Sequence, residues 1–133
     1  YNATCAANGP RMQVISHTFP RAVVGMQGAK QKRDPDAPAY RTRKAGCHIV
    51  YDFPHTDVGN RRGGQPAGVA IFLQTWLVAY VSTIKYPTHK RLQGRGGNVR
   101  IKLPDGRDYD FITICARVEE PGGREGDINN ALW

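Results

Sequence analysis

The stretch CHIVYDF, residues 47–53, shows the clearest alternation of side-chain types along the chain. Its odd-numbered residues are apolar or aromatic, whereas its even-numbered residues include His48 and Asp52. Successive side chains of a strand point to opposite faces, and Pro54 would end the strand. We therefore predict a half-buried strand with polar groups on its solvent face. The residues expected to point inward are Ile49, Tyr51 and Phe53.

Residues 67–84, AGVAIFLQTWLVAYVSTI, carry large apolar side chains three and four positions apart. This is the spacing of an amphipathic helix, and the preceding Pro66 suits a first helical turn. We predict the main helix here. Two buried strands are the alternative, because valine, isoleucine and tyrosine favour strands. A membrane span is not expected, because Gln74 and Thr75 interrupt a stretch already near the lower length limit.

The C-terminal half contains a hairpin pattern. NVRIKL and RDYDFITICARV flank Pro104, Asp105 and Gly106, a turn sequence that joins antiparallel strands. The first strand should place Arg100 and Lys102 on one face. Its other face should carry Val99, Ile101 and Leu103.

The N-terminal half is less regular. Met12, Ile15 and Phe19 have helical spacing before Pro20, which predicts a short helix. Residues 27–46 read as a long, charged surface loop. A chain of 133 residues fits a single domain, residues 1–133. The expected fold class is α+β, an antiparallel sheet with one main helix packed on it and long basic loops.

The charge balance points to a class of partner. The chain has 19 Lys and Arg against 11 Asp and Glu, a net charge of +8. Such a surface attracts polyanions, and RNA is the expected partner, with a host protein as a further possibility. A positive charge that only maintains solubility is the alternative.

Three cysteines and the first residues bear on localisation. The chain begins at Tyr1 without Met and carries the glycosylation triplet Asn2-Ala3-Thr4, which favours a secreted mature protein. Cys5 would then form a disulfide with one of the other two cysteines, Cys47 or Cys115. A reduced protein with buried thiols is the alternative.

Metal and cofactor sites are not expected. The four histidines are scattered and form no ligand motif such as HxxxH or HExxH. No Walker loop or GxGxxG fingerprint is present.

Arginine stands beside Gly-Gly three times, in RRGGQ (61–65), GRGGN (94–98) and PGGRE (121–125). Glycine lets backbone N–H groups approach an anion, and arginine offers a planar fork for phosphate oxygens. Simple turns with solvated arginines are the alternative. The expected nucleic-acid-binding residues are Arg43, Lys44, Arg61, Arg62, Lys90, Arg91, Arg95, Arg100 and Lys102.

Candidate catalytic groups come from the strand 47–53 and from the hairpin. His48 and Asp52, about 13 Å apart on one strand face, would line a groove. Arg100 on a neighbouring strand would add a cation. A base, an acid and an arginine are the groups needed to cleave RNA through its own 2′-OH.

The motifs YNATC, YDFP and GGNVRIKL occur in this order along the chain. Here the sequence resembles the fungal guanyl-preferring ribonucleases, their ribotoxin relatives and ribonuclease-like secreted fungal effectors. The resemblance implies that Asp52 stands at the catalytic Glu position and Arg100 at the catalytic Arg position. The acid histidine of that family is replaced by Ala116 and Arg117 in ICARVEE.

Three functions follow from these observations. The first is a secreted, non-catalytic, ribonuclease-like binding protein or effector that contacts RNA or another polyanion. The second is an active ribonuclease in which His89 or His55 supplies the acid. The third is a virion or filament subunit that contacts nucleic acid.

Overall fold

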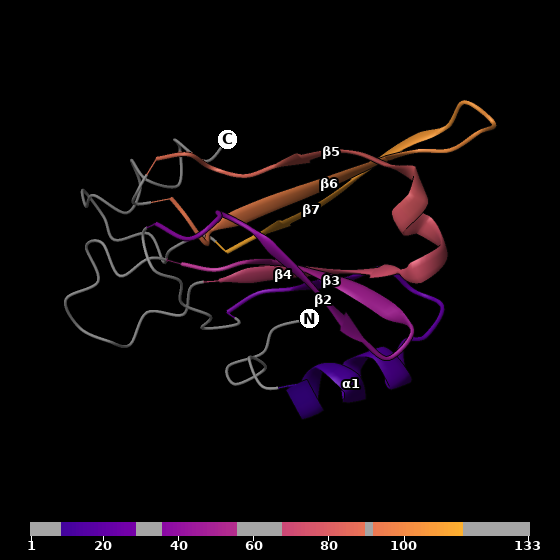
Figure 1. Cartoon of the computed structure of the whole chain (residues 1–133), viewed down its shortest axis with the longest axis horizontal. Coiled ribbons are helices and arrows are strands. Elements are labelled where there is room, and N and C mark those ends of the chain that lie inside the picture. The colour runs from indigo at the N-terminus through magenta and orange to yellow at the C-terminus, as the bar shows by residue number, and fades with distance from the viewer. Residues whose placement is uncertain (1–8, 29–35, 56–67, 90–91, 116–133) are drawn as a thin grey trace, which may run out of the picture.

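The structure is a computed structural model and describes residues 9–28, 36–55, 68–89 and 92–115. Within these ranges it has three layers, formed by a three-stranded sheet, a four-stranded sheet and an α-helix below them (Figure 1). The helix is α1 (Gly9–Thr18). In spatial order, the four-stranded sheet consists of β1 (Val24–Met26), β4 (Val69–Gln74), β3 (His48–Phe53) and β2 (Arg41–Ala45). The other sheet consists of β5 (Val81–Lys85), β6 (Gly96–Lys102) and β7 (Asp108–Ile114).

All neighbouring strands run antiparallel, which confirms the α+β class with an antiparallel sheet and a packed helix. The helix that packs on the sheet is α1, the short helix expected before Pro20. It buries Met12 and Ile15 and exposes Val14.

The main helix predicted at residues 67–84 is wrong. This segment forms β4, a short 3-10 helix η1 (Thr75–Tyr80) and β5. β4 lies between β1 and β3, and its residues Val69 to Leu73 are all buried. A strand covered on both faces needs apolar side chains at consecutive positions, and such a run also satisfies a helical spacing. The alternative prediction of two buried strands agrees better with the structure, although β5 is only partly buried.

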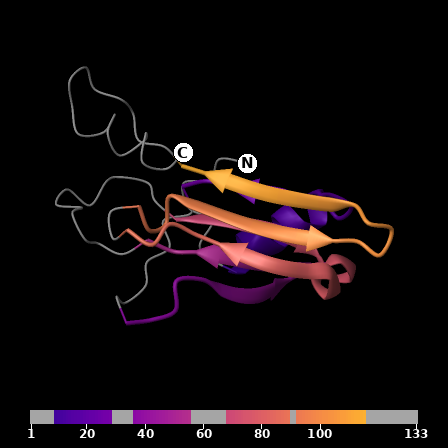
Figure 2. The ribbon, with the colours of Figure 1, turned by 90° about the horizontal axis from the view of Figure 1, so that it is seen from above.

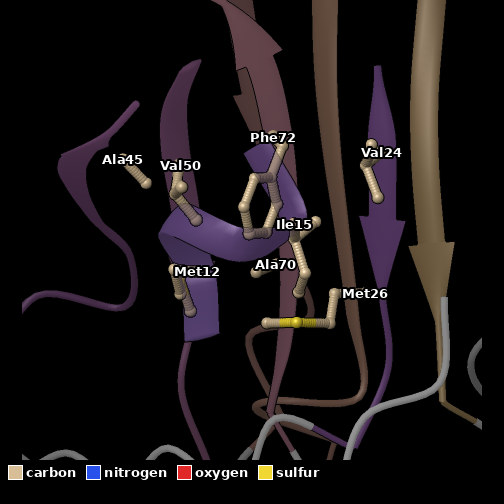
Figure 3. Packing of buried hydrophobic residues seen from close by; sticks show 8 residues of the cluster. All are labelled: Met12, Ile15, Val24, Met26, Ala45, Val50, Ala70 and Phe72. Carbon is tan, nitrogen blue, oxygen red and sulfur yellow. The ribbon is translucent and has the colours of Figure 1, made fainter. Parts of the chain in front are cut away.

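Strand β3 is buried on both faces, so the prediction of a solvent face is wrong. Tyr51 and Phe53 point into the core between the two sheets. Val50 points the other way, into a second cluster between the four-stranded sheet and α1 (Figure 3). This second cluster comprises Met12, Ile15, Val24, Met26, Ala45, Val50, Ala70 and Phe72. The sequence alternation is therefore real, but a helix covers the face expected to meet solvent.

The hairpin of β6 and β7 is confirmed. Lys102 stands opposite Asp108, and the amide of Leu103 donates to the carbonyl of Arg107 at 2.9 Å. Gly106 has φ +88°, a conformation that glycine adopts without strain. The expected faces are also confirmed, with Val99 and Ile101 buried in the core between the sheets.

The two long sides of the sheet pair differ. On one side β1 and β7 are joined, because the Thr113 hydroxyl donates to the Met26 carbonyl at 3.4 Å. The side-chain amide of Gln27 likewise donates to the Ile114 carbonyl. On the other side the edge strands are β2 and β5 (Figure 2). There the rings of Tyr40 and Tyr86 meet, with centroids 5.9 Å apart.

Candidate nucleic-acid interface

His48 is fully buried on the side of β3 that faces α1. Its Nε2 lies 2.8 Å from the Ala22 carbonyl oxygen, which only accepts, so Nε2 carries a hydrogen. Nδ1 lies 2.6 Å from the Ser16 hydroxyl and accepts its hydrogen when the imidazole is neutral, and the same hydroxyl oxygen accepts from the Cys47 amide at 3.1 Å. The imidazole thus connects β3 to α1 and to the segment after it. His48 is therefore a buried side chain with a structural role.

Asp52 is also fully buried. Its carboxylate lies 2.8 Å from Nε of Arg43 and 3.5 Å from Nε of Arg41, both on the adjacent strand β2. Burial raises the pKa of Asp52, and the two guanidinium groups oppose this rise. The expected groove lined by His48 and Asp52 is therefore wrong, because neither side chain reaches the surface.

Arg100 lies in the other sheet, on its outer face. It donates to Asp108 at 3.2 Å and lies 3.9 Å from Asp110. β6 is not a neighbour of β3, so the expected shared face of Arg100 with His48 and Asp52 is also wrong. His89 is exposed and follows β5. The four candidate catalytic residues are not brought together.

The predicted binding residues fall at several places. Lys44 is exposed on β2, and Lys102 is exposed on the outer face of β6. Arg95 is only 4% exposed, and its Nη1 donates to the Cys115 carbonyl at 3.1 Å. Arg61, Arg62, Lys90 and Arg91 lie outside the described residues.

The glycines of GRGGN have packing roles. A Cβ on Gly94 would lie 2.6 Å from the Cα of His55, and Gly94 also has φ +79°. A Cβ on Gly97 would overlap the ring of Phe53. Glycine is required at both positions, because the backbone before β6 and within β6 approaches its neighbours closely. Neither a phosphate cradle nor a solvated turn describes this segment, and the other two Arg-Gly-Gly segments lie outside the described residues.

Cations and aromatic rings do gather where β2 and β5 begin and end. We call Tyr40, Arg41, Lys44, Lys85 and Tyr86 the basic edge surface. The Arg41 side chain is 55% exposed, and Lys44 and Lys85 are exposed. Tyr40 directly precedes β2 and Tyr86 directly follows β5, so the contact between the two rings places the start of β2 beside the end of β5. Lys44 lies toward the other end of β2.

Lys85, Tyr40 and Tyr86 were not among the predicted binding residues. The sequences AYRTRK and IKYP, where a tyrosine stands next to a cation, could have indicated them. Tyr40 also lies near the buried Tyr51. Burial, with a smaller contribution from Tyr40, raises the pKa of Tyr51.

The described residues also bear on metal ligands, membrane helices and cysteines. Within them, no three His, Cys, Asp or Glu side chains are grouped to hold a metal ion. No helix in the described ranges is long and apolar enough to cross a membrane. Cys47 and Cys115 are not joined to each other by a disulfide. Cys5 lies outside the described residues, so its disulfide stays a prediction.

No protein-family model matches this chain, and no curated protein sequence matches it. One similar solved structure is the crystal structure of AP endonuclease LMAP from Leishmania major, with a TM-score of 0.55 and 14% sequence identity. The match covers 87% of this chain and 38% of the endonuclease chain. This chain thus spans well under half the length of that protein. At this level of identity the likeness concerns the fold alone.

Proposed function

We propose that this protein binds nucleic acid through phosphate contacts at the basic edge surface, and that His48, Asp52, Arg100 and His89 do not form a catalytic centre. The observation that carries the proposal is the exposed basic edge of the four-stranded sheet. β2 has the sequence RTRKA and a single strand neighbour, and Lys85 lies on the edge strand of the second sheet.

Charge supports this surface as the contact region. Four of the described carboxylates are engaged by arginines: Asp52, Asp105, Asp108 and Asp110. These pairs neutralise Arg43, Arg100 and Arg107 locally, and Arg41 also lies 3.5 Å from Asp52. Lys44 and Lys85, in contrast, are exposed on the two edge strands. Cations on an open edge can reach successive phosphates of a flexible strand.

The test is binding of fluorescent RNA and DNA at increasing salt. Phosphate contacts predict an affinity that falls steeply between about 50 and 200 mM salt. The double variant Lys44→Ala/Lys85→Ala should weaken binding and reduce the salt slope by about 2. Arg21→Ala, at an exposed position after α1, is the control for loss of a cation elsewhere on the molecule. Affinity that does not change with salt, or a larger effect of Arg21→Ala, would contradict the proposal.

Secretion and an effector role acting on RNA or a host protein remain part of the proposal. Mass measurement of the native protein with and without reductant tests the secretion part. A disulfide that includes Cys5 would support an oxidising compartment.

Endonuclease activity is a second candidate, favoured by the fold likeness to an AP endonuclease over 87% of this chain. Purified protein would be incubated with single-stranded RNA, with intact ribosomes and with duplex DNA containing an AP site. Cleavage that His89→Ala abolishes would establish an enzyme with His89 as an essential group. Absence of cleavage together with salt-sensitive binding would support the binding function alone.

A further inference from the structure

The Tyr40/Tyr86 pair is held from the core side and is open on the other. The Tyr40 ring lies 6.2 Å from that of Phe53, which is 1% exposed in the core between the sheets. Tyr86 packs on Tyr40 at 5.9 Å with an interplanar angle of 47° and remains 37% exposed. The buried Phe53 thus anchors Tyr40, which in turn supports an exposed aromatic ring.

Cations lie close to this pair along the chain. Arg41 directly follows Tyr40 and Lys85 directly precedes Tyr86, so by strand alternation their side chains point to the opposite faces of their strands. Arg41 also lies 3.5 Å from the Asp52 carboxylate. Lys44 stands four residues after Tyr40, on the same face of β2 by strand alternation. The pair comes from two different sheets, so its position depends on the packing of the whole sandwich (Figure 2).

We infer that the Tyr40/Tyr86 pair stacks against unpaired bases, so that the nucleic acid bound at the basic edge surface is single-stranded. This inference rests on the proposed phosphate-binding function. Every base offers a π face to an aromatic side chain, and adjacent cations follow the backbone. Tyrosine loses little side-chain entropy on binding, because it has two rotatable side-chain bonds.

Duplex nucleic acid would not use this surface in the same way. Its bases are already stacked and paired, so their faces do not reach an exposed tyrosine. Phosphate contacts alone do not favour a single strand, since a duplex carries the higher charge density. Tighter binding of single-stranded than of duplex nucleic acid would therefore indicate that the tyrosine pair stacks on bases.

A structural role is the competing explanation, in which the two rings only close the side of the sandwich opposite β1 and β7. The two explanations differ in what the exposed ring of Tyr86 does for affinity. Tyr86→Leu keeps an apolar side chain of similar reach but removes the π face, whereas Tyr86→Phe keeps the ring. Tyr109→Leu is the matched control, because Tyr109 is 40% exposed on β7 at the other edge of that sheet.

The experiment measures fluorescence anisotropy of the full chain with a labelled single-stranded DNA, its duplex and, by competition, inorganic polyphosphate, which has no bases. Unmodified protein should prefer the single strand. Tyr86→Leu should lower affinity for it by about tenfold, the usual range for one stacked base being about fivefold to a hundredfold. Its affinity for duplex and polyphosphate should not change, and Tyr86→Phe and Tyr109→Leu should match the unmodified protein.

Several outcomes would overturn the inference. A preference for duplex in the unmodified protein would do so without any variant, even if Tyr86→Leu did not fold. Equal losses for all three ligands in a folded Tyr86→Leu would show a structural role only. In both cases salt-sensitive binding would still support the proposed phosphate-binding function. If none of the three ligands binds, both the proposed function and the stacking inference are contradicted.

Discussion

His48 and Asp52 are polar side chains that lie inside the molecule, each with partners that offset the loss of water. The imidazole has the Ser16 hydroxyl and the Ala22 carbonyl, and the carboxylate has Arg41 and Arg43. Burial of a polar group is unfavourable unless such partners are present. His48 and Asp52, which the sequence made candidate catalytic residues, therefore have structural roles.

Replacing His48 by alanine should destabilise the protein. The change leaves Ser16 and the Ala22 carbonyl without this partner and creates a cavity, which together predict a loss of about 3 kcal/mol in the free energy of unfolding. Urea denaturation measures this loss. His89→Ala, at an exposed position, should change the value by less than about 0.5 kcal/mol. Equal stability of the two variants would show that His48 is not an internal structural group.

Asp52 predicts a pH dependence of stability. Burial raises its pKa above the ordinary value of 3.8, so the folded state holds this proton more strongly than the unfolded state. Its contribution to stability is therefore fully present below pH 3.8 and is lost as pH rises through the higher pKa of the folded state. The difference in unfolding free energy between the natural protein and Asp52→Asn should follow this trend. A difference that instead grows in favour of the natural protein would mean that the arginines outweigh burial.

At the scale of elements, β6 and β1 show how close packing determines which residues a strand can use. Gly97 of β6 lies against the ring of Phe53 at the end of β3, so the two sheets approach each other without an intervening side chain. Gly25 of β1, in contrast, has room for a Cβ, with the nearest atom of Thr113 at 3.6 Å.

Gly97→Ala should therefore destabilise the protein by about 2 kcal/mol, because the added methyl group overpacks the space between the sheets. Gly25→Ala is the matched control and should be close to neutral. Thermal unfolding of both variants gives the comparison. If Gly25→Ala proves the more harmful, β6 does not approach Phe53 as described.

At the scale of the whole molecule, β4 and β3 form the centre, with α1 below them and the second sheet above (Figure 1). β7 and β5 are edges of the second sheet. Local opening requires least energy where few buried contacts are lost.

Native-state hydrogen exchange should consequently be slowest for amides of β4 and β3 and faster for β5 and for the exposed part of β7. The protection factors should span a wide range, since the central strands open only with global unfolding. Uniform protection across both sheets would contradict this division.

The virion or filament hypothesis also belongs to this scale and stays a prediction. Trp76 is 61% exposed on η1, as that hypothesis expects, and Trp133 lies outside the described residues. A sizing column separates the possibilities, because a monomer at high protein concentration would count heavily against a subunit role. The resemblance to fungal ribonucleases likewise stays a prediction.

The sequence by itself determined the features that depend on neighbouring residues. Pro104, Asp105 and Gly106 predicted the turn between β6 and β7, and strand alternation placed Val99 and Ile101 inward. The spacing of Met12 and Ile15 predicted α1, and the excess of Lys and Arg predicted a basic molecule. These features are local or additive along the chain, so no tertiary information was needed.

Only the tertiary structure decided the features that depend on distant partners. Whether residues 69–74 form a helix or a strand, and whether β3 has one buried face or two, depends on what packs against both sides. The same is true of the candidate site. The packing of α1 and β2 buries His48 and Asp52. The Tyr40/Tyr86 pair forms because β2 begins beside the end of β5, which belongs to the other sheet. A pattern of side chains along one segment carries no information on which other segment will cover it, and burial is a property of that contact.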